Sequence, residues 1–152
     1  MKRRKDSLNG ISIVIPVFNE GKNILNLIDE IEEVMTNIIK FEILVVDDGS
    51  TDNTYKNITK KKRISKKLRI LRHAKNYGQS ISLRTGILQS KENYVITLDG
   101  DGQNNPSDIL SLIKTYNTKK DFLLVIGNRV KRNDNRIRRI VSRSAYLIRR
   151  VV

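Results

Sequence analysis

The residues with the clearest chemical potential form an acidic cluster in the second half of the chain. Asp99, Asp101 and Gln103 alternate with glycines and follow a short apolar run. In an extended segment, two carboxylates separated by one residue can point the same way, and the Gln103 oxygen adds a third hard ligand. Such ligands suit Mg²⁺ or Mn²⁺, which usually bind one or two carboxylates together with substrate phosphates. The pattern therefore predicts a divalent-metal site that would hold a diphosphate.

Three other kinds of phosphate or metal site fit this stretch less well. A calcium EF-hand loop requires Gly at its sixth position and Glu at its twelfth, whereas counting from Asp99 these are Asn104 and Leu110. A phosphatase that forms an aspartyl phosphate, with Asp99 as nucleophile, is compatible with the spacing. The G-x-x-x-x-G-K phosphate loop is absent, which excludes the common nucleotide triphosphatases.

The elements that must position this cluster alternate along the chain. Short apolar runs typical of buried strands cover residues 11–18, 41–46, 68–71, 94–98 and 122–126. Between them, helical spacing or capping residues predict helices over residues 24–38, from about 51, over 79–90 and over 106–117. Continuous apolar strands separated by helices indicate an α/β domain, in which a mostly parallel, doubly wound sheet has helices on both faces.

Polar clusters fall where three of these strands end, at Asn19–Glu20, Asp47–Asp48 and Asp99–Asp101. In open α/β sheets the ligand crevice lies outside the carboxyl ends of the strands. Helix capping is an equally good explanation for one polar cluster alone, and it suits Asp52 or Ser107 well. Three clusters on one rim predict a binding site.

Length and composition limit the possible classes of protein. The 152 residues allow one domain, which we expect to span residues 1–152. The absence of cysteine excludes a disulfide framework, a cysteine zinc site, a thiol nucleophile and an iron–sulfur cluster, and it favours the cytosol. The longest apolar run, Phe122–Ile126, is too short to cross a membrane, and no signal peptide is expected at the start.

The net charge of +14 is concentrated in two segments. Residues 60–75 and 129–152 hold most of the excess Lys and Arg, which suggests an anionic partner or, for the first segment, a solvated face. The second segment has apolar residues at helical spacing between its arginines, namely Ile137, Ile140, Val141, Leu147, Ile148 and Val151. It predicts a basic amphipathic helix, which would lie on a membrane surface or pack on the core.

Four motifs in order resemble glycosyltransferase family 2: Ile13–Glu20, Val45–Asp52, Asn76–Ser80 and Asp99–Gln103. The dolichyl-phosphate mannose synthase group and its bacterial polyprenyl-phosphate relatives are most similar, because Gly127-Asn-Arg129, a basic stretch and Ser142-Arg143 follow. The resemblance implies a Rossmann-like nucleotide-diphospho-sugar transferase (GT-A) fold. It also implies inverting transfer of a sugar from a UDP- or GDP-linked donor to a polyprenyl phosphate of the dolichyl or undecaprenyl type.

The resemblance also implies roles in binding the donor. The nucleotide pocket would be lined by Pro16, Phe18, Glu20, Val46 and Asp48. The Asp48 carboxylate would accept a hydrogen bond from a ring N–H of the base, which is a natural role for an ionised acceptor, while Asp47 would be structural. Uracil and guanine both have such an N–H, so this role does not distinguish a UDP-linked donor from a GDP-linked one.

The resemblance also implies catalytic residues that neutralise the negative charge of phosphate groups. Asp99 and Asp101, assisted by Gln103, would hold Mg²⁺ or Mn²⁺, which neutralises charge on the departing diphosphate. Gly100 would let the backbone approach the sugar or diphosphate closely. Two arginines, Arg129 and Arg143, would pair with phosphate oxygens.

A lipid-phosphate acceptor would need no dedicated base, because a phosphate monoester has a second pKa of about 6. His73, outside the four motifs, is expected to be structural. The expected partners are a nucleotide-diphosphate sugar, a polyprenyl phosphate and an anionic membrane surface, with a peripheral location at the cytoplasmic face.

Two alternatives to a complete transferase stay open. Because the chain ends within the basic helix, it is expected to lack its C-terminal acceptor-binding or membrane part. It would then be a nucleotide-sugar-binding domain without turnover. A basic nucleic-acid-binding module is the other alternative, although no nucleic acid is expected because residues 60–75 lack aromatic side chains for stacking.

Overall fold

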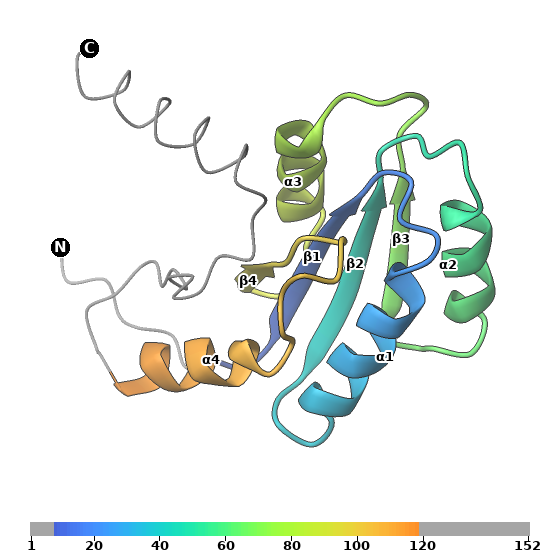
Figure 1. The fold of residues 1–152 in the computed structure, drawn as a ribbon. Coiled ribbons are helices and arrows are strands. Elements are labelled where there is room, and N and C mark those ends of the chain that lie inside the picture. Colours follow the sequence, from blue (N-terminus) through green and yellow to red (C-terminus); the bar gives the residue numbers. More distant parts are fainter. Residues whose placement is uncertain (1–7, 119–152) are drawn as a thin grey trace, which may run out of the picture.

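The computed structural model describes residues 8–118, in which strands and helices alternate (Figure 1). The elements are β1 (Ile11–Val17), α1 (Ile24–Met35), β2 (Phe41–Asp47), α2 (Thr54–Lys62), β3 (Leu68–Arg72), α3 (Gln79–Leu88), β4 (Tyr94–Thr97) and α4 (Asp108–Thr118). Each of them was predicted from the sequence. The predicted strand at 122–126 and the basic helix at 129–152 lie outside the described residues.

The four strands form one parallel sheet in the order β3-β2-β1-β4. In register, Ile11 of β1 pairs with Phe41 of β2 and with Tyr94 of β4. All residues of β1 and β2 are buried, as their continuous β-branched and apolar runs require of central strands. The predicted α/β fold with a parallel sheet is confirmed.

Helices cover both faces of the sheet. On one face, the odd-numbered side chains of β1 and β2 share a core with the apolar stripes of α1, α2 and α4, including Ile15, Ile28, Ile43, Ile58 and Ile109. On the other face, α3 packs so closely that Gly86 lies against the side chains of Val14 and Val46. Because a strand directs alternate side chains to opposite faces, the buried strands β1 and β2 pack against helices on both faces of the sheet.

Several helix ends differ from the sequence prediction: α3 ends at Leu88 rather than at residue 90, and α4 covers Asp108–Thr118 rather than 106–117. The first helix ends at Met35 rather than at Ile38, because Asn37 adopts a left-handed φ of 61° and Ile38 is half exposed. The second helix begins at Thr54 rather than near Thr51. Asp52 Oδ1 accepts a hydrogen bond from the Thr54 N–H at 2.9 Å just before this start, but the N-cap residue is Asn53, which makes no side-chain capping hydrogen bond.

A buried carboxylate, that of Glu42, ties three strands together. It accepts hydrogen bonds from Ser12 Oγ at 2.6 Å, from Arg69 Nη1 at 2.7 Å and from the Lys91 N–H at 2.6 Å. Burial acts to raise the pKa of Glu42, but the hydrogen bonds from Arg69, Ser12 and Lys91 outweigh it and lower the pKa. Glu42 is therefore ionised at neutral pH despite its burial.

This network predicts an acid-sensitive contribution to folding stability. Because the folded pKa of Glu42 lies below its ordinary value of 4.5, its contribution is present above that pH and lost as pH falls through the folded pKa. Glu42→Gln is expected to lower the free energy of unfolding at pH 7 by about 2 kcal/mol and to flatten its dependence on acid. Urea unfolding between pH 7 and pH 3 measures both effects. Equal loss in the exposed control Glu33→Gln would contradict the prediction.

The basic stretch at 60–75 is partly neutralised within the fold. Lys61 pairs with Asp29 and Glu32 of α1, and the hydrogen bond with Asp29 raises the pKa of Lys61. Two arginines of β3 pair in the same way, Arg69 with Glu42 and Arg72 with Asp47. Three of the nine basic residues of this stretch therefore have acidic partners within the fold. Within residues 8–118, no helix combines the length and apolar character needed to cross a membrane.

Candidate functional site

A cavity of about 280 Å³ lies at the carboxyl ends of β1, β2 and β4. The strand order reverses between β1 and β4, and this switch point is where open α/β sheets bind ligands. The start of α3 closes one side of the cavity. Its lining residues are Pro16, Val17, Phe18, Glu20, Asp48, Asn76, Gly78, Gln79, Ser82, Asp99, Gly100 and Asp101.

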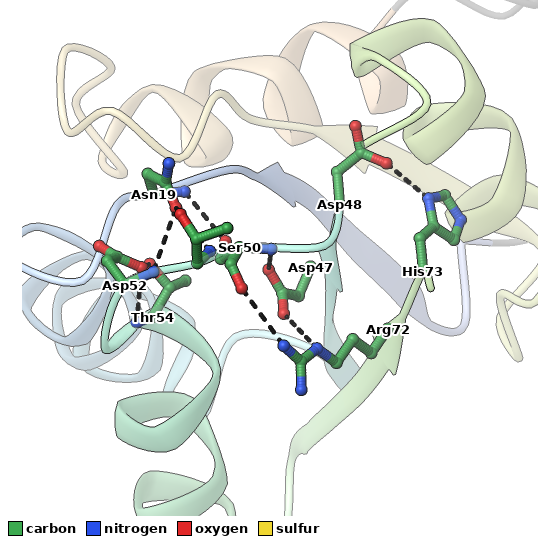
Figure 2. A network of polar contacts seen from close by, with 9 residues as sticks. Asn19, Asp47, Asp48, Ser50, Asp52, Thr54, Arg72 and His73 are labelled. Atoms are coloured by element: carbon green, nitrogen blue, oxygen red, sulfur yellow. Dashed lines mark hydrogen bonds and ion pairs between the residues drawn. The ribbon is translucent and has the colours of Figure 1, made fainter. Parts of the chain in front are cut away.

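The loops after β1 and β2 hold each other in place (Figure 2). Asn19 has a φ of 58°, and its Oδ1 accepts a hydrogen bond from the Thr51 N–H at 2.9 Å. In return, Ser50 Oγ accepts a hydrogen bond from the Asn19 N–H at 2.9 Å. This reciprocal contact positions Phe18 and Glu20, which flank Asn19 and line the cavity.

Asp47 has the structural role that the sequence predicted. Its side chain is fully buried, and its Oδ1 accepts a hydrogen bond from the Ser50 N–H at 3.0 Å. Its Oδ2 lies 3.2 Å from Arg72 Nε, and Arg72 also donates to the Ser50 carbonyl (Figure 2). Asp47 therefore shapes the turn after β2 and does not line the cavity.

Asp48, the next residue, anchors the segment that leads into α3. Its carboxylate accepts hydrogen bonds from the N–H groups of Tyr77 at 3.1 Å and Gly78 at 2.7 Å, and it lies 2.7 Å from His73 Nδ1. Burial acts to raise the pKa of Asp48, but these hydrogen bonds outweigh it and lower the pKa. Asp48 is therefore an ionised acceptor in the cavity wall, although only 3% of the residue is exposed.

His73 belongs to this site, which the sequence analysis did not predict. Figure 2 shows the contact of its ring with Asp48. The ring Nε2 lies 3.0 Å from Thr85 Oγ1, so the ring connects Asp48 to α3. The register of the sheet explains the contact. Arg72 at the end of β3 pairs with Asp47 at the end of β2, so the residues that follow them, His73 and Asp48, are neighbours. The sequence feature that could have indicated this contact is the position of His73 directly after a strand. Its role is structural, as predicted, but it supports a site residue.

The two acidic side chains after β4 line the same cavity, as predicted. Asp99 Oδ1 accepts a hydrogen bond from Gln79 Nε2 at 2.8 Å, and Asp101 Oδ1 accepts one from the Gln103 N–H at 3.0 Å. Gln103 itself is exposed and does not line the cavity. Its place among the metal ligands stays a prediction. Gly102, between Asp101 and Gln103, has a left-handed φ of 72°, and this turn accompanies the hydrogen bond from the Gln103 backbone N–H to Asp101.

The packing of the central strands places two further residues of the predicted donor site. A Cβ at Gly100 would clash with Val17 Cγ1 and lie 3.0 Å from the Pro16 carbonyl, so the missing side chain lets the loop after β4 pack on β1. Gly100 also lines the cavity, and its predicted role toward the sugar or diphosphate stays a prediction. Val46 does not line the cavity, because it is fully buried against α3 near Gly86. It lies on the α3 face of β2, before the strand ends.

The model of the family "Glycosyl transferase family 2" matches residues 12–150. The chain belongs to glycosyltransferase family 2. It is 35% identical over 145 residues to the dodecaprenyl-phosphate galacturonate synthase of Rhizobium johnstonii, covering 93% of this chain and 43% of that protein. It is 33% identical over 142 residues to the undecaprenyl-phosphate 4-deoxy-4-formamido-L-arabinose transferase of Proteus mirabilis, covering 91% of this chain and 42% of that protein. The chain thus spans less than half the length of these relatives.

Solved structures of glycosyltransferases have the same fold. A mannosyltransferase from Pyrobaculum calidifontis in complex with GDP-Man and Mn²⁺ superposes with a TM-score of 0.56 at 25% identity, over 60% of this chain and 27% of that one. Glucosyl-3-phosphoglycerate synthase from Mycobacterium tuberculosis in complex with UDP gives a TM-score of 0.61 at 20% identity, over 79% and 47%. The predicted GT-A type of fold is confirmed.

The residues of this family member fit a divalent cation. Asp99 and Asp101 supply two hard oxygen ligands in one cavity, and within residues 8–118 no group of three or more acidic or histidine ligands gathers. Mg²⁺ and Mn²⁺ sites of this kind take their other ligands from water and substrate phosphate.

The predicted arginines Arg129 and Arg143 lie outside the described residues. Sequence reasoning gave no role to Asn76, Gly78, Gln79 or Ser82, although the first three fall within the third motif.

Proposed function

We propose that this chain is the catalytic domain of an inverting, metal-dependent glycosyltransferase that uses a UDP- or GDP-linked sugar and a polyprenyl phosphate. The observation that carries the proposal is that Asp48 and the Asp99–Asp101 pair, from distant motifs, line one cavity. The names of the two relatives, which specify dodecaprenyl phosphate and undecaprenyl phosphate, support the acceptor. A GDP-Man complex and a UDP complex among the similar structures leave either base as the donor.

On the donor side, each acidic group has a separate task. Asp48 would accept a hydrogen bond from a ring N–H of the base, while Asp99 and Asp101 would hold Mg²⁺ or Mn²⁺ at the diphosphate end of the cavity. When bound, the ion supplies positive charge that stabilises the departing nucleoside diphosphate. Phe18 and Glu20 flank the nucleotide from the loop after β1.

On the acceptor side, an oxygen of the lipid phosphate attacks the anomeric carbon opposite the leaving diphosphate. The bond from that carbon to the diphosphate oxygen breaks, and the nucleoside diphosphate leaves with the electron pair. The phosphate nucleophile is already largely ionised, so no side chain needs to take a proton. Arg129 and Arg143 keep their predicted role of pairing with phosphate oxygens. The reaction takes place at the cytoplasmic face of a membrane, with the protein bound peripherally to its anionic surface.

Two measurements on the same preparation test the proposal. Calorimetric titration of UDP, GDP and their sugar conjugates, with Mn²⁺ or with a chelator, is expected to give metal-dependent binding for one base. Transfer of labelled sugar to undecaprenyl phosphate in anionic vesicles is then expected with that donor. Metal-dependent binding without transfer would identify a donor-binding domain instead. If no nucleotide binds, the proposal fails, and salt-sensitive binding of DNA or RNA would favour the nucleic-acid alternative.

A further inference from the structure

The start of α3 connects the two acidic parts of the cavity. The N–H groups of Tyr77 and Gly78 are held by Asp48, at the end of β2. The next residue, Gln79, donates a hydrogen bond from Nε2 to Asp99 Oδ1 at 2.8 Å, after β4. Since β1 separates β2 from β4 in the sheet, these contacts bridge the central strand. Three consecutive residues therefore link Asp48 to Asp99.

We propose that Gln79 is a positioning residue that orients the Asp99 carboxylate toward a divalent cation. The inference rests on the proposed function and extends it. A hydrogen bond to one carboxylate oxygen limits rotation of the side chain, and such outer partners raise the metal affinity of the carboxylates they hold. Asp99 is therefore oriented before the cation binds.

The chemistry of an amide suits this task. A Lys or Arg at the same place would also donate to Asp99, but its positive charge would oppose a cation at the same carboxylate. The neutral amide of Gln79 donates a hydrogen bond and leaves the negative charge of Asp99 in place. The local charge thus stays available to the cation.

The backbone fixes where this amide can reach. Gln79 is the first residue of α3 and follows Gly78, which has a φ of 93° and whose N–H lies 2.7 Å from Asp48 Oδ2. His73 holds the same carboxylate and contacts Thr85 within α3. The Gln79 side chain itself is exposed to the cavity and is no part of the core, so its replacement tests orientation separately from folding.

Replacement of Gln79 by Met tests the inference, because Met keeps the length of the side chain and removes the donor. Free Mn²⁺ is measured by electron paramagnetic resonance during titration of the full chain, with Mn²⁺ alone and with added UDP or GDP. We expect Gln79→Met to weaken Mn²⁺ binding about 10–100-fold while leaving the melting temperature unchanged. The control Gln89→Met alters an exposed glutamine just past the other end of α3 and is expected to match the wild-type chain.

The possible outcomes separate the two proposals. Wild-type affinity for Mn²⁺ in Gln79→Met would overturn the inference and leave the proposed function standing. A fall in melting temperature that accompanies the lost affinity would assign Gln79 a structural role and would also overturn it. A wild-type chain that binds no Mn²⁺, alone or with either nucleotide, would overturn the proposed function together with the inference.

Discussion

Replacement of Asp101 by Asn is expected to weaken the Mn²⁺-dependent part of donor binding by roughly 100-fold or more and to abolish sugar transfer. The substitution removes one of two anionic ligands while keeping the size of the side chain. Metal ions contribute several kcal/mol of charge stabilisation to such reactions, and each 1.36 kcal/mol is about tenfold. Calorimetry with Mn²⁺ or chelator measures the binding, and labelled donor measures the transfer.

The fold should tolerate this change. The introduced asparagine side chain would keep an oxygen that can accept the Gln103 N–H, now held by Asp101 Oδ1 at 3.0 Å. Asp99→Asn is expected to have a similar effect on binding. Asp108→Asn provides a matched control, because Asp108 is exposed at the start of α4 and does not line the cavity. Full metal-dependent binding in Asp101→Asn would remove this carboxylate from the metal site.

The second large effect concerns folding and comes from Gly49. This residue has a φ of 74°, and a Cβ there would lie 2.6 Å from the carbonyl carbon of Lys75 and 2.9 Å from the backbone nitrogen of Asn76. Gly49→Ala is expected to lower the free energy of unfolding by roughly 2–5 kcal/mol, because left-handed strain adds to overpacking against backbone. Urea unfolding measures the loss.

Gly102 offers a matched control for this prediction. Its φ of 72° is nearly the same, but a Cβ there would meet only Asn23 Cβ at an ordinary 3.8 Å. Gly102→Ala should therefore cost only the strain of roughly 1–2 kcal/mol. Equal losses in the two variants would show that the contact with Lys75 and Asn76 does not limit stability. Because Asn76 lines the cavity, Gly49→Ala is also expected to weaken donor binding.

The elements and the rim of the site could be predicted because they depend on local patterns. The continuous apolar runs that became β1 and β2 require burial on both faces, and parallel strands bring their carboxyl ends to one edge. That is why Asp48, Asp99 and Asp101 could be placed in one cavity from the sequence.

The remaining features depend on contacts between distant residues. The contact of His73 with Asp48 depends on the register between β2 and β3, which no local pattern specifies. The role of Gly100 depends on how closely the loop after β4 packs on β1. In the same way, the acidic partners of Lys61 and Arg69 lie on other elements, so the sequence showed only an unbroken basic stretch.

The reciprocal hydrogen bonds between the loops after β1 and β2 have a consequence for protein engineering. Asn19 accepts from the Thr51 N–H and donates its own N–H to Ser50 Oγ, so each loop supplies partners that the other requires. A chimera that receives only one of the two loops from a relative of different donor preference would leave polar groups of the other loop without partners. Under the proposed function, redesign of donor preference therefore requires that the two loops are grafted together, as a unit.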